Sequence, residues 1–260
     1  MSQVQPGVQT IDRLKKQWSS GAATYGAIVT IPSVQIVQVL ANAGLDWIVI
    51  DMEHAPIGLD AAHAMIVATA GSATVPMVRI AATVPWLAKP VLDLGAAGIV
   101  FPMILNRGDA EACVRAVRYP PEGERHWGPF YAPMRWGQSM MEYISGANRA
   151  ILSVITIEHP DAVDNIDEVC ATPGLDMAFI GPGDLAMSMG HPGEFSHPDV
   201  MAAMARAEAG ILRSNVVAGG LARSADEARR MIDRGYRALV LGFDWSLLQR
   251  GVSSVLDGLR

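Results

Sequence analysis

The chain has 260 residues, of which 50% are hydrophobic and 18% are charged, and its formal net charge is -6. This length and composition are typical of a globular protein with a large core, so we expect one domain over residues 1–260. The negative charge, without a basic stripe and interleaved aromatic residues, excludes an electrostatic surface for nucleic acid.

Eight short apolar runs, rich in β-branched residues, alternate with amphipathic stretches. The runs predict strands at 25–30, 47–51, 75–79, 98–101, 150–157, 177–180, 215–218 and 238–241. Helical periodicity marks residues 34–43, 59–70, 85–94, 107–117, 160–170 and 225–234. Buried strands that are each followed by a helix predict a parallel sheet, and eight such units in about 250 residues predict a closed (β/α)8 TIM barrel.

An open, doubly wound sheet is the competing architecture. Such a sheet normally carries a glycine-rich dinucleotide loop after its first strand. This chain has Thr30-Ile31-Pro32-Ser33 at that point, which is not such a loop. The barrel is therefore the predicted fold.

Residues 119–137 break the alternation of strands and helices. This stretch is rich in proline and glycine and also holds Trp127, Phe130, Tyr131 and Trp136. We predict a long ordered loop, because loops of this length are usually functional or disordered and the aromatic side chains argue against disorder. We interpret it as a lid or wall over the site, or as a contact between subunits.

The cysteines and the apolar runs constrain the cellular setting. Cys113 and Cys170 form no Cys-x-x-Cys pair and lie in stretches with helical character, so we predict buried, reduced thiols. Residues 1–10 lack the basic and then apolar pattern of a signal peptide, and no run of about 18 apolar residues occurs. We expect a cytoplasmic protein that has no membrane partner.

Polar residues follow several of the predicted strands. They are Asp51, Glu53 and His54 after the second strand, Arg79 after the third, Glu158 after the fifth, Asp184 after the sixth and Asp244 after the eighth. The carboxyl ends of parallel strands meet at one rim of a barrel, where barrel enzymes keep their catalytic residues. We therefore expect these side chains to converge.

Glu158 and Asp184 form a candidate metal site. Two carboxylates without a neighbouring Cys or His-x-x-x-His pair suit a hard divalent ion such as Mg²⁺ or Mn²⁺ better than zinc. Each acid also has a structural explanation, because Glu158 could cap the helix that starts near Pro160 and Asp184 could lie in the first turn of a short helix. Their place on consecutive strands favours the metal.

Three further residues suit the binding of an anionic substrate. His54 lies three residues after Asp51 and is a candidate general base. Arg79 suits a carboxylate or enolate oxygen, unless it forms a structural ion pair with Asp51 or Glu53. Gly183 could present backbone N–H groups to an anion at a helix start, although an ordinary strand-to-helix turn explains it equally well.

These residues belong to a series of short motifs along the chain. The motifs cover residues 46–56, 78–79, 92–96, 101–103, 118–121, 157–158 and 181–185. In this order they resemble the HpcH/HpaI aldolase family, the class II, metal-dependent pyruvate aldolases. The resemblance extends from Trp18 to Gly251 and implies a barrel of the phosphoenolpyruvate/pyruvate type with a swapped terminal helix.

The resemblance implies roles for individual residues at the rim. Glu158 and Asp184 match the metal ligands of the family, and the ion would be Mg²⁺, Mn²⁺ or Co²⁺. His54 matches the catalytic base, and Asp51 is the acid that precedes it in the same loop. Arg79 matches the arginine that stabilises the enolate.

Other matched residues concern the substrate and the assembly. Gly183 and Asp184 match the backbone amides that hold the pyruvate carboxylate. Asp93 matches an acid that reaches a histidine of a neighbouring subunit, which implies a homo-oligomer, commonly a hexamer built as a trimer of dimers. Thr156 and Trp127 depart from the family pattern near the expected substrate, so both are candidate substrate contacts, and the bulk of Trp127 favours a larger or more aromatic aldehyde.

The implied reaction cleaves or forms a 4-hydroxy-2-oxoacid, with pyruvate and an aldehyde as the other side of the equilibrium, through a metal-stabilised enolate. Lys89 is the only lysine after residue 20 and lies in a predicted helix, which argues against a Schiff-base aldolase.

Two alternatives use the same scaffold, and a third is not catalytic. Oxaloacetate decarboxylation and citrate-lyase-β-like cleavage of an acyl thioester would use the same type of enolate. A thioester would need a basic groove, and residues 118–137 offer only three arginines for it, Arg118, Arg125 and Arg135. A non-catalytic 2-oxoacid-binding protein is disfavoured by the complete set of rim residues.

Overall fold

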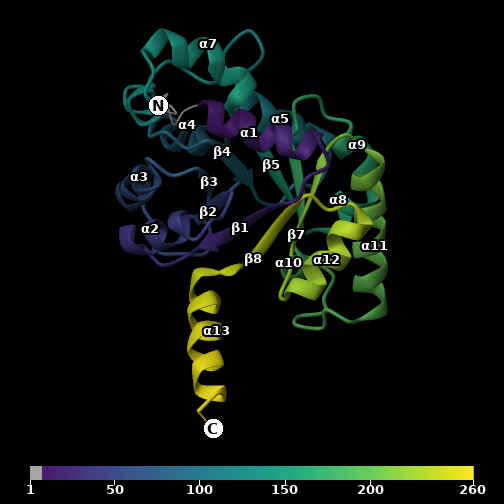
Figure 1. Ribbon diagram of the computed structural model, residues 1–260. Coiled ribbons are helices and arrows are strands. Elements are labelled where there is room, and N and C mark those ends of the chain that lie inside the picture. Colours follow the sequence, from purple (N-terminus) through teal and green to yellow (C-terminus); the bar gives the residue numbers. More distant parts are fainter. Residues whose placement is uncertain (1–7, 260) are drawn as a thin grey trace.

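The computed structural model describes residues 8–259 and contains a closed barrel of eight parallel strands (Figure 1). The strands are β1 Thr24–Val29, β2 Trp47–Asp51, β3 Val75–Arg79, β4 Gly98–Phe101, β5 Leu152–Ile157, β6 Met177–Ile180, β7 Val217–Leu221 and β8 Ala238–Phe243. Each strand pairs with the next in the chain, and β8 pairs with β1. The predicted (β/α)8 barrel is confirmed, although β5 and β7 begin two residues later than expected.

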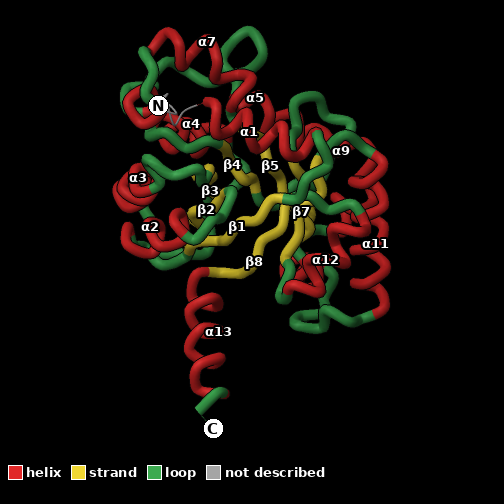
Figure 2. The backbone as a smooth tube through the Cα atoms, viewed as in Figure 1, coloured by secondary structure: helices red, strands yellow, loops and turns green. Residues whose placement is uncertain are grey.

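Helices surround the strands on the outside of the barrel (Figure 2). They are α1 Val8–Ser19, α2 Val34–Asn42, α3 Leu59–Ala68, α4 Pro85–Asp93, α5 Arg107–Val117, α6 Ala132–Trp136, α7 Met140–Ala150, α8 Pro160–Asp164, α9 Ile166–Cys170, α10 Pro182–Ser188, α11 Pro198–Arg213, α12 Ala225–Arg234 and α13 Asp244–Asp257. The predicted helices are present, with the stretch 160–170 divided into α8 and α9. Helices α1, α6, α7 and α11 were not predicted from the sequence, and a terminal helix such as α13 was implied only by the family resemblance.

The core is built from strands that are buried on both faces. Every residue of β2, β3 and β5 is buried, as expected for parallel strands with a filled barrel on one side and helices on the other. Trp47 of β2 leaves no room for a side chain on the neighbouring β1, because a Cβ at Gly26 would collide with its indole ring. The large and small residues are therefore matched across adjacent strands.

Helix α1 packs at the amino end of the barrel. Its Ile11, Leu14 and Trp18 are buried and lie three and four residues apart, which is the spacing of one helical face. The indole N–H of Trp18 donates to Thr24 Oγ1 at 2.8 Å, and the indole N–H of Trp47 donates to the same oxygen at 3.1 Å. This spacing is the sequence signal for α1.

Asp244 joins the last strand to the first at the carboxyl end. Its Oδ2 accepts from the backbone N–H of Thr30 at 3.0 Å and of Ile31 at 2.8 Å, and its Oδ1 accepts from the Thr30 hydroxyl at 2.8 Å. The residue is almost fully buried. Asp244 therefore holds the loop after β1 against the start of α13, and its carboxylate is occupied by this structural role.

Helix α13 extends away from the barrel beyond this point (Figure 1). Of its residues only Asp244 is buried. The exposed apolar side chains of the helix and of the residues after it are Trp245, Leu248, Val252, Val255, Leu256 and Leu259. Their three- and four-residue spacing forms an apolar stripe, which we call the α13 stripe, and nothing in residues 8–259 covers it.

Residues 119–137, which we call the aromatic segment, lie at the amino end of the barrel. The segment follows α5, and barrel helices run back from the carboxyl end of the sheet to its amino end. Arg125 bonds Asp93 at the end of α4 (2.8 Å), and Arg135 bonds Thr69 just after α3 (2.5 Å). The prediction of a lid over the chain's own site is therefore wrong, and the predicted loop contains the short helix α6. A contact between subunits stays a prediction.

Two smaller expectations concern the thiols and the membrane. Cys113 and Cys170 are free and buried, as predicted. Within residues 8–259, no helix is both long enough and apolar enough to cross a membrane.

Candidate active site

Asp51 and Arg79 form a buried ion pair at the carboxyl rim. They are the last residues of β2 and β3 and stand opposite each other in the strand register. Arg79 Nε donates to Asp51 Oδ1 at 2.9 Å, and Arg79 Nη2 donates to Asp51 Oδ2 at 2.7 Å. Burial by itself lowers the pKa of Arg79, but the neighbouring carboxylates raise it overall, so the guanidinium stays charged.

Glu53 and His54 extend this pair towards solvent. Arg79 Nη1 lies 3.0 Å from Glu53 Oε2, and the same oxygen lies 3.6 Å from His54 Nε2. Burial raises the pKa of the Glu53 carboxyl, while Arg79 and His54 act to lower it. The His54 side chain is 59% exposed, so the imidazole stands at the open side of the cluster. From the sequence, Glu53 was predicted to lie at the rim and to be a possible ion-pair partner of Arg79, but it was given no role in the reaction.

Glu158 and Asp184 approach each other beside Gly181. Glu158 directly follows β5 and is 2% exposed, whereas Asp184 lies in the first turn of α10 and is exposed. A Cβ placed on Gly181 would lie 3.2 Å from Glu158 Oε2 and 3.9 Å from Asp184 Oδ2. The two carboxylate oxygens thus face a common space, which a glycine at 181 leaves open.

The structure excludes the capping explanation for Glu158. Its Oε1 accepts the backbone N–H of Met103 at 2.6 Å, and Met103 lies far along the chain from the helix that Glu158 could have capped. The N-cap of α8 is His159, whose Nδ1 accepts the backbone N–H of Asp161 at 3.2 Å. Glu158 is therefore not a capping residue. Asp184 does lie in a first helical turn, so its helical explanation is also correct.

The donor atoms at this place fit a hard divalent ion. Glu158 Oε2 and Asp184 Oδ2 are oxygen ligands, and such ligands suit Mg²⁺ and Mn²⁺. Within residues 8–259, neither carboxylate forms a salt bridge, while Arg79 is engaged by Asp51 and Glu53. A buried carboxylate such as Glu158 is costly without a cation, and a bound ion at the common space would supply one.

Thr156 lies two residues before Glu158 on β5 and is buried. Its hydroxyl donates to the backbone carbonyl of Phe101 at 3.2 Å. Gly183 lies in the first turn of α10 beside Asp184.

Trp127 and Asp93 are not brought to the rim within one chain. Trp127 belongs to the aromatic segment and is 62% exposed. Asp93 ends α4 at the amino end, where its Oδ1 accepts from Arg125 Nη2 at 2.8 Å. A single chain therefore assembles Asp51, His54, Arg79, Glu158 and Asp184, but not these two residues.

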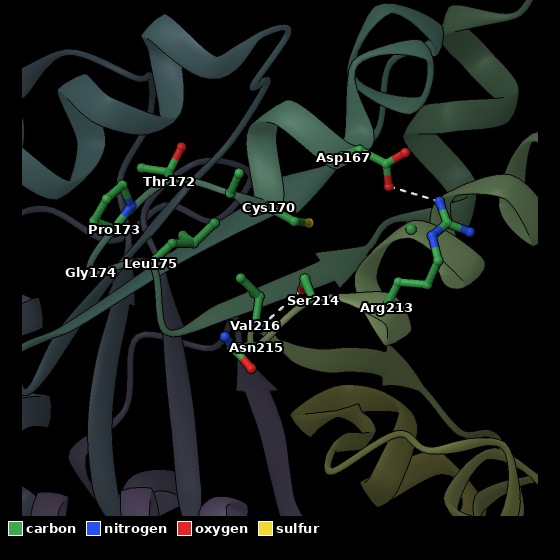
Figure 3. Close-up of a pocket in the computed structure, with 12 residues that line it drawn as sticks. Asp167, Cys170, Thr172, Pro173, Gly174, Leu175, Arg213, Ser214, Asn215 and Val216 are labelled. Carbon is green, nitrogen blue, oxygen red and sulfur yellow. Dashed lines mark hydrogen bonds and ion pairs between the residues drawn. The ribbon is translucent and has the colours of Figure 1, made fainter.

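A separate cavity of about 470 Å³ lies near the amino end, between the segments that follow α9 and α11 (Figure 3). Cys170, Thr172 and Ser214 line it, and Arg213 bonds Asp167 at 2.7 Å beside it. None of the predicted site residues lines this cavity. Its ion pair is solvent-exposed and its thiol is protonated at neutral pH, because burial raises the pKa of Cys170 to about 11. We therefore place the candidate site at the rim.

Residues 29–250 match the family model described as HpcH/HpaI aldolase/citrate lyase. The chain belongs to the HpcH/HpaI family. It is 35% identical to a hydroxypyruvate/pyruvate aldolase of Pseudomonas aeruginosa, over 93% of this chain and 90% of the relative. It is 34% identical to a 5-keto-4-deoxy-D-glucarate aldolase of Shigella boydii, over 86% of this chain and 86% of the relative.

A solved structure extends the similarity to the fold. The crystal structure of an HpcH/HpaI aldolase/citrate lyase family protein from Burkholderia cenocepacia J2315 superimposes with a TM-score of 0.87 at 34% identity, covering 95% of this chain and 99% of that one. The family predicted from the sequence motifs is confirmed. The chain is a carbon–carbon lyase of the aldolase type.

Proposed function

We propose that this protein is a divalent-metal-dependent aldolase that cleaves or forms a 4-hydroxy-2-oxoacid, with pyruvate as one product. The observation that carries the proposal is the approach of Glu158 and Asp184 beside Gly181, next to the charged cluster of Arg79 and Glu53. Relatives named as aldolases for pyruvate, hydroxypyruvate and a keto-deoxy sugar acid support a 2-oxoacid as the substrate class.

Glu158 and Asp184 would hold the ion, with Mg²⁺ or Mn²⁺ preferred for their oxygen ligands and Co²⁺ as a further candidate. When bound, the ion supplies Lewis-acid polarisation of the 2-keto oxygen. The backbone N–H groups at Gly183 and Asp184, in the first turn of α10, would hold the substrate carboxylate.

His54 would move the proton in this reaction. In cleavage it takes the proton from the 4-hydroxyl group, the C3–C4 bond breaks, and the electron pair stays on the pyruvate half as an enolate. C4 leaves as the aldehyde carbon, and the enolate then takes a proton at C3. Glu53, with Oε2 3.6 Å from His54 Nε2, would stabilise the imidazolium that forms.

Arg79 would stabilise the negative charge of the enolate. Asp51 accepts hydrogen bonds from Nε and Nη2, and Nη1 lies 3.0 Å from Glu53 Oε2. The N–H groups of Nη1 and Nη2 that Asp51 does not accept would bind a substrate oxygen. The buried pair with Asp51 fixes the plane of the guanidinium before the substrate binds, which is the preorganisation that such stabilisation needs.

A homo-oligomer would complete the site. The α13 stripe is an exposed apolar surface on a helix that leaves the barrel, and packing it against a neighbouring chain would remove it from water. We propose a hexamer, built as a trimer of dimers with α13 exchanged. In this assembly Asp93 and Trp127 would reach the rim of a neighbouring chain, with Asp93 facing His54 and Trp127 near the aldehyde half of the substrate.

The second candidate is a decarboxylase or an acyl-thioester lyase on the same scaffold. The family description, which includes citrate lyase, favours it. The basic groove expected for a thioester cofactor does not form from the candidate arginines. Arg118 and Arg125 are buried, and Arg135 is bonded to Thr69 and to the Ile66 carbonyl. We therefore rank the aldolase first.

The deciding experiment measures pyruvate release from 4-hydroxy-2-oxoacids with aliphatic, acidic and aromatic tails, with and without Mg²⁺ or Mn²⁺. We expect release only with the ion, and no release by Glu158→Gln, whereas Glu168→Gln on the exposed face of α9 serves as the matched control. Pyruvate release in the presence of a chelator would contradict the proposal. Release from oxaloacetate alone would favour the decarboxylase.

A further inference from the structure

Among residues 8–259, Met103 is the only non-glycine residue with a positive φ, which is 53°. It follows β4 at the carboxyl rim, in the sequence Phe101-Pro102-Met103. A left-handed backbone is unfavourable for a residue with a side chain, and such residues persist where their surroundings enforce them. The conformation therefore points to a function of this segment.

The left-handed conformation accompanies a direct contact with Glu158. The backbone N–H of Met103 donates to Glu158 Oε1 at 2.6 Å, which is short, as expected when the acceptor is ionised. Glu158 is buried, so water does not compete strongly for this oxygen. The other oxygen, Oε2, is the one that lies beside Gly181, as Asp184 Oδ2 does.

Two hydroxyl groups hold the segment from either side. The Thr156 hydroxyl, from β5, donates to the carbonyl of Phe101 at 3.2 Å. The Thr83 hydroxyl, from the loop after β3, donates to the carbonyl of Pro102. The two consecutive carbonyls before Met103 are thus anchored, and Pro102 restricts the backbone between them.

We propose that Phe101–Met103, held by Thr83 and Thr156, is a positioning element that binds one oxygen of Glu158 and leaves only the other for the metal ion. The proposal rests on the proposed function, because it assigns Glu158 as a ligand through Oε2 alone. Met103, Thr83 and Thr156 are positioning residues, since they act through Glu158. This role explains why a buried threonine stands at position 156.

The experiment measures binding of Mn²⁺ alone, by titration calorimetry, to substrate-free protein. Met103→Val keeps the N–H but disfavours the left-handed backbone, so binding should weaken at least about tenfold. Met103→Gly keeps the N–H and accepts a positive φ, so it should bind within about threefold of wild type. Thr83→Val and Thr156→Val should weaken binding by about tenfold, and Thr83→Ser and Thr156→Ser should restore it.

Thr172→Val is the matched control, because Thr172 is a buried threonine at the amino end and its hydroxyl has no partner within residues 8–259. It should leave Mn²⁺ binding unchanged. If Met103→Val, Thr83→Val and Thr156→Val bind Mn²⁺ like wild type while Glu158→Gln does not bind, the positioning role is overturned and the proposed function stands. If Glu158→Gln binds like wild type, both are overturned.

A second measurement uses the wild-type protein, so it does not require any variant to fold. Hydrogen exchange of the Met103 amide in the metal-free wild type reports the contact with Glu158 directly. The amide should exchange more slowly than the neighbouring exposed amides of this loop. Exchange at the rate of an unprotected amide would overturn the positioning role.

Discussion

Single residues at the rim divide into two groups with different electrostatics. Arg79 is enclosed by Asp51 and Glu53, so the positive charge there is already compensated. Glu158 and Asp184 form no salt bridge within residues 8–259, and the only short contact of Glu158 is with a backbone N–H. The rim thus combines two carboxylates that have no cationic partner with a guanidinium that is already paired and fixed in place.

Removal of Arg79 should destabilise the fold as well as the reaction. Arg79→Met leaves the buried carboxylate of Asp51 and the half-buried carboxylate of Glu53 without their partner, so we expect the free energy of unfolding to fall by about 3–5 kcal/mol in urea denaturation. Arg206→Met is the matched control, because Arg206 pairs with Asp164 on the exposed surface at 3.2 Å, and it should cost less than about 1 kcal/mol. Equal losses of stability in the two variants would contradict the larger cost that we expect for removing the buried partner of Asp51.

Removal of the His54 imidazole should affect turnover and leave the fold intact. The side chain is exposed, so His54→Ala should keep the wild-type melting temperature and Mn²⁺ affinity while the rate of pyruvate release falls by about 10²- to 10⁴-fold. His63→Ala on α3 is the control and should leave the rate unchanged. A wild-type rate in His54→Ala would remove His54 as the base.

Among the elements, α13 and the aromatic segment each lie at the end of the barrel where the preceding strand or helix ends. The aromatic segment follows helix α5, so it lies at the amino end of the barrel. The prediction of a lid did not take this order of elements into account. Helix α13 follows a strand and therefore begins at the carboxyl end, where Asp244 directs its start. The two elements therefore lie at opposite ends of the barrel.

Charge on the α13 stripe should disrupt the proposed hexamer. Leu248→Glu and Val252→Glu place carboxylates on the exposed apolar face, so we expect a smaller particle in light scattering coupled to size-exclusion chromatography. Gln249→Glu adds the same charge to a polar position of the same helix and should leave the mass unchanged. A wild-type mass for both stripe variants would exclude this face from the interface.

For the whole molecule, buried thiols set an alkaline limit of stability. Burial raises the pKa of the Cys170 thiol from 9.0 to about 11, and burial also raises the pKa of the Cys113 thiol. A folded-state pKa above that of the unfolded chain gives stability that is complete below about pH 9. That stability is lost as the pH rises through the folded-state values.

The free energy of unfolding should therefore fall between about pH 9 and 11, with up to about 3 kcal/mol coming from Cys170 alone. Urea denaturation at intervals over this range measures the slope. Cys170→Ala should have a shallower slope than wild type, because it removes one of the raised groups. The same slope in both proteins would contradict the assignment to this thiol.

The sequence by itself determined the barrel fold and which polar residues lie at its carboxyl rim. Eight apolar runs that alternate with amphipathic stretches allow few other folds, since each strand must be buried on both faces. The polar residues that end β2, β3, β5 and β6 share a rim because parallel strands place their carboxyl ends together. These are consequences of local periodicity and chain order, so no contact needed to be known.

Only the tertiary structure decided what each rim residue contacts. Glu158 could have capped α8 from its sequence position, but His159 does so, and Glu158 instead meets the N–H of Met103, 55 positions away. Asp244 directly follows β8 and Asp51 is the last residue of β2, yet Asp51 pairs with Arg79 whereas Asp244 binds the loop after β1. Such pairings depend on which strands become neighbours and on backbone conformations such as that of Met103, and neither is encoded in the spacing of residues along one element.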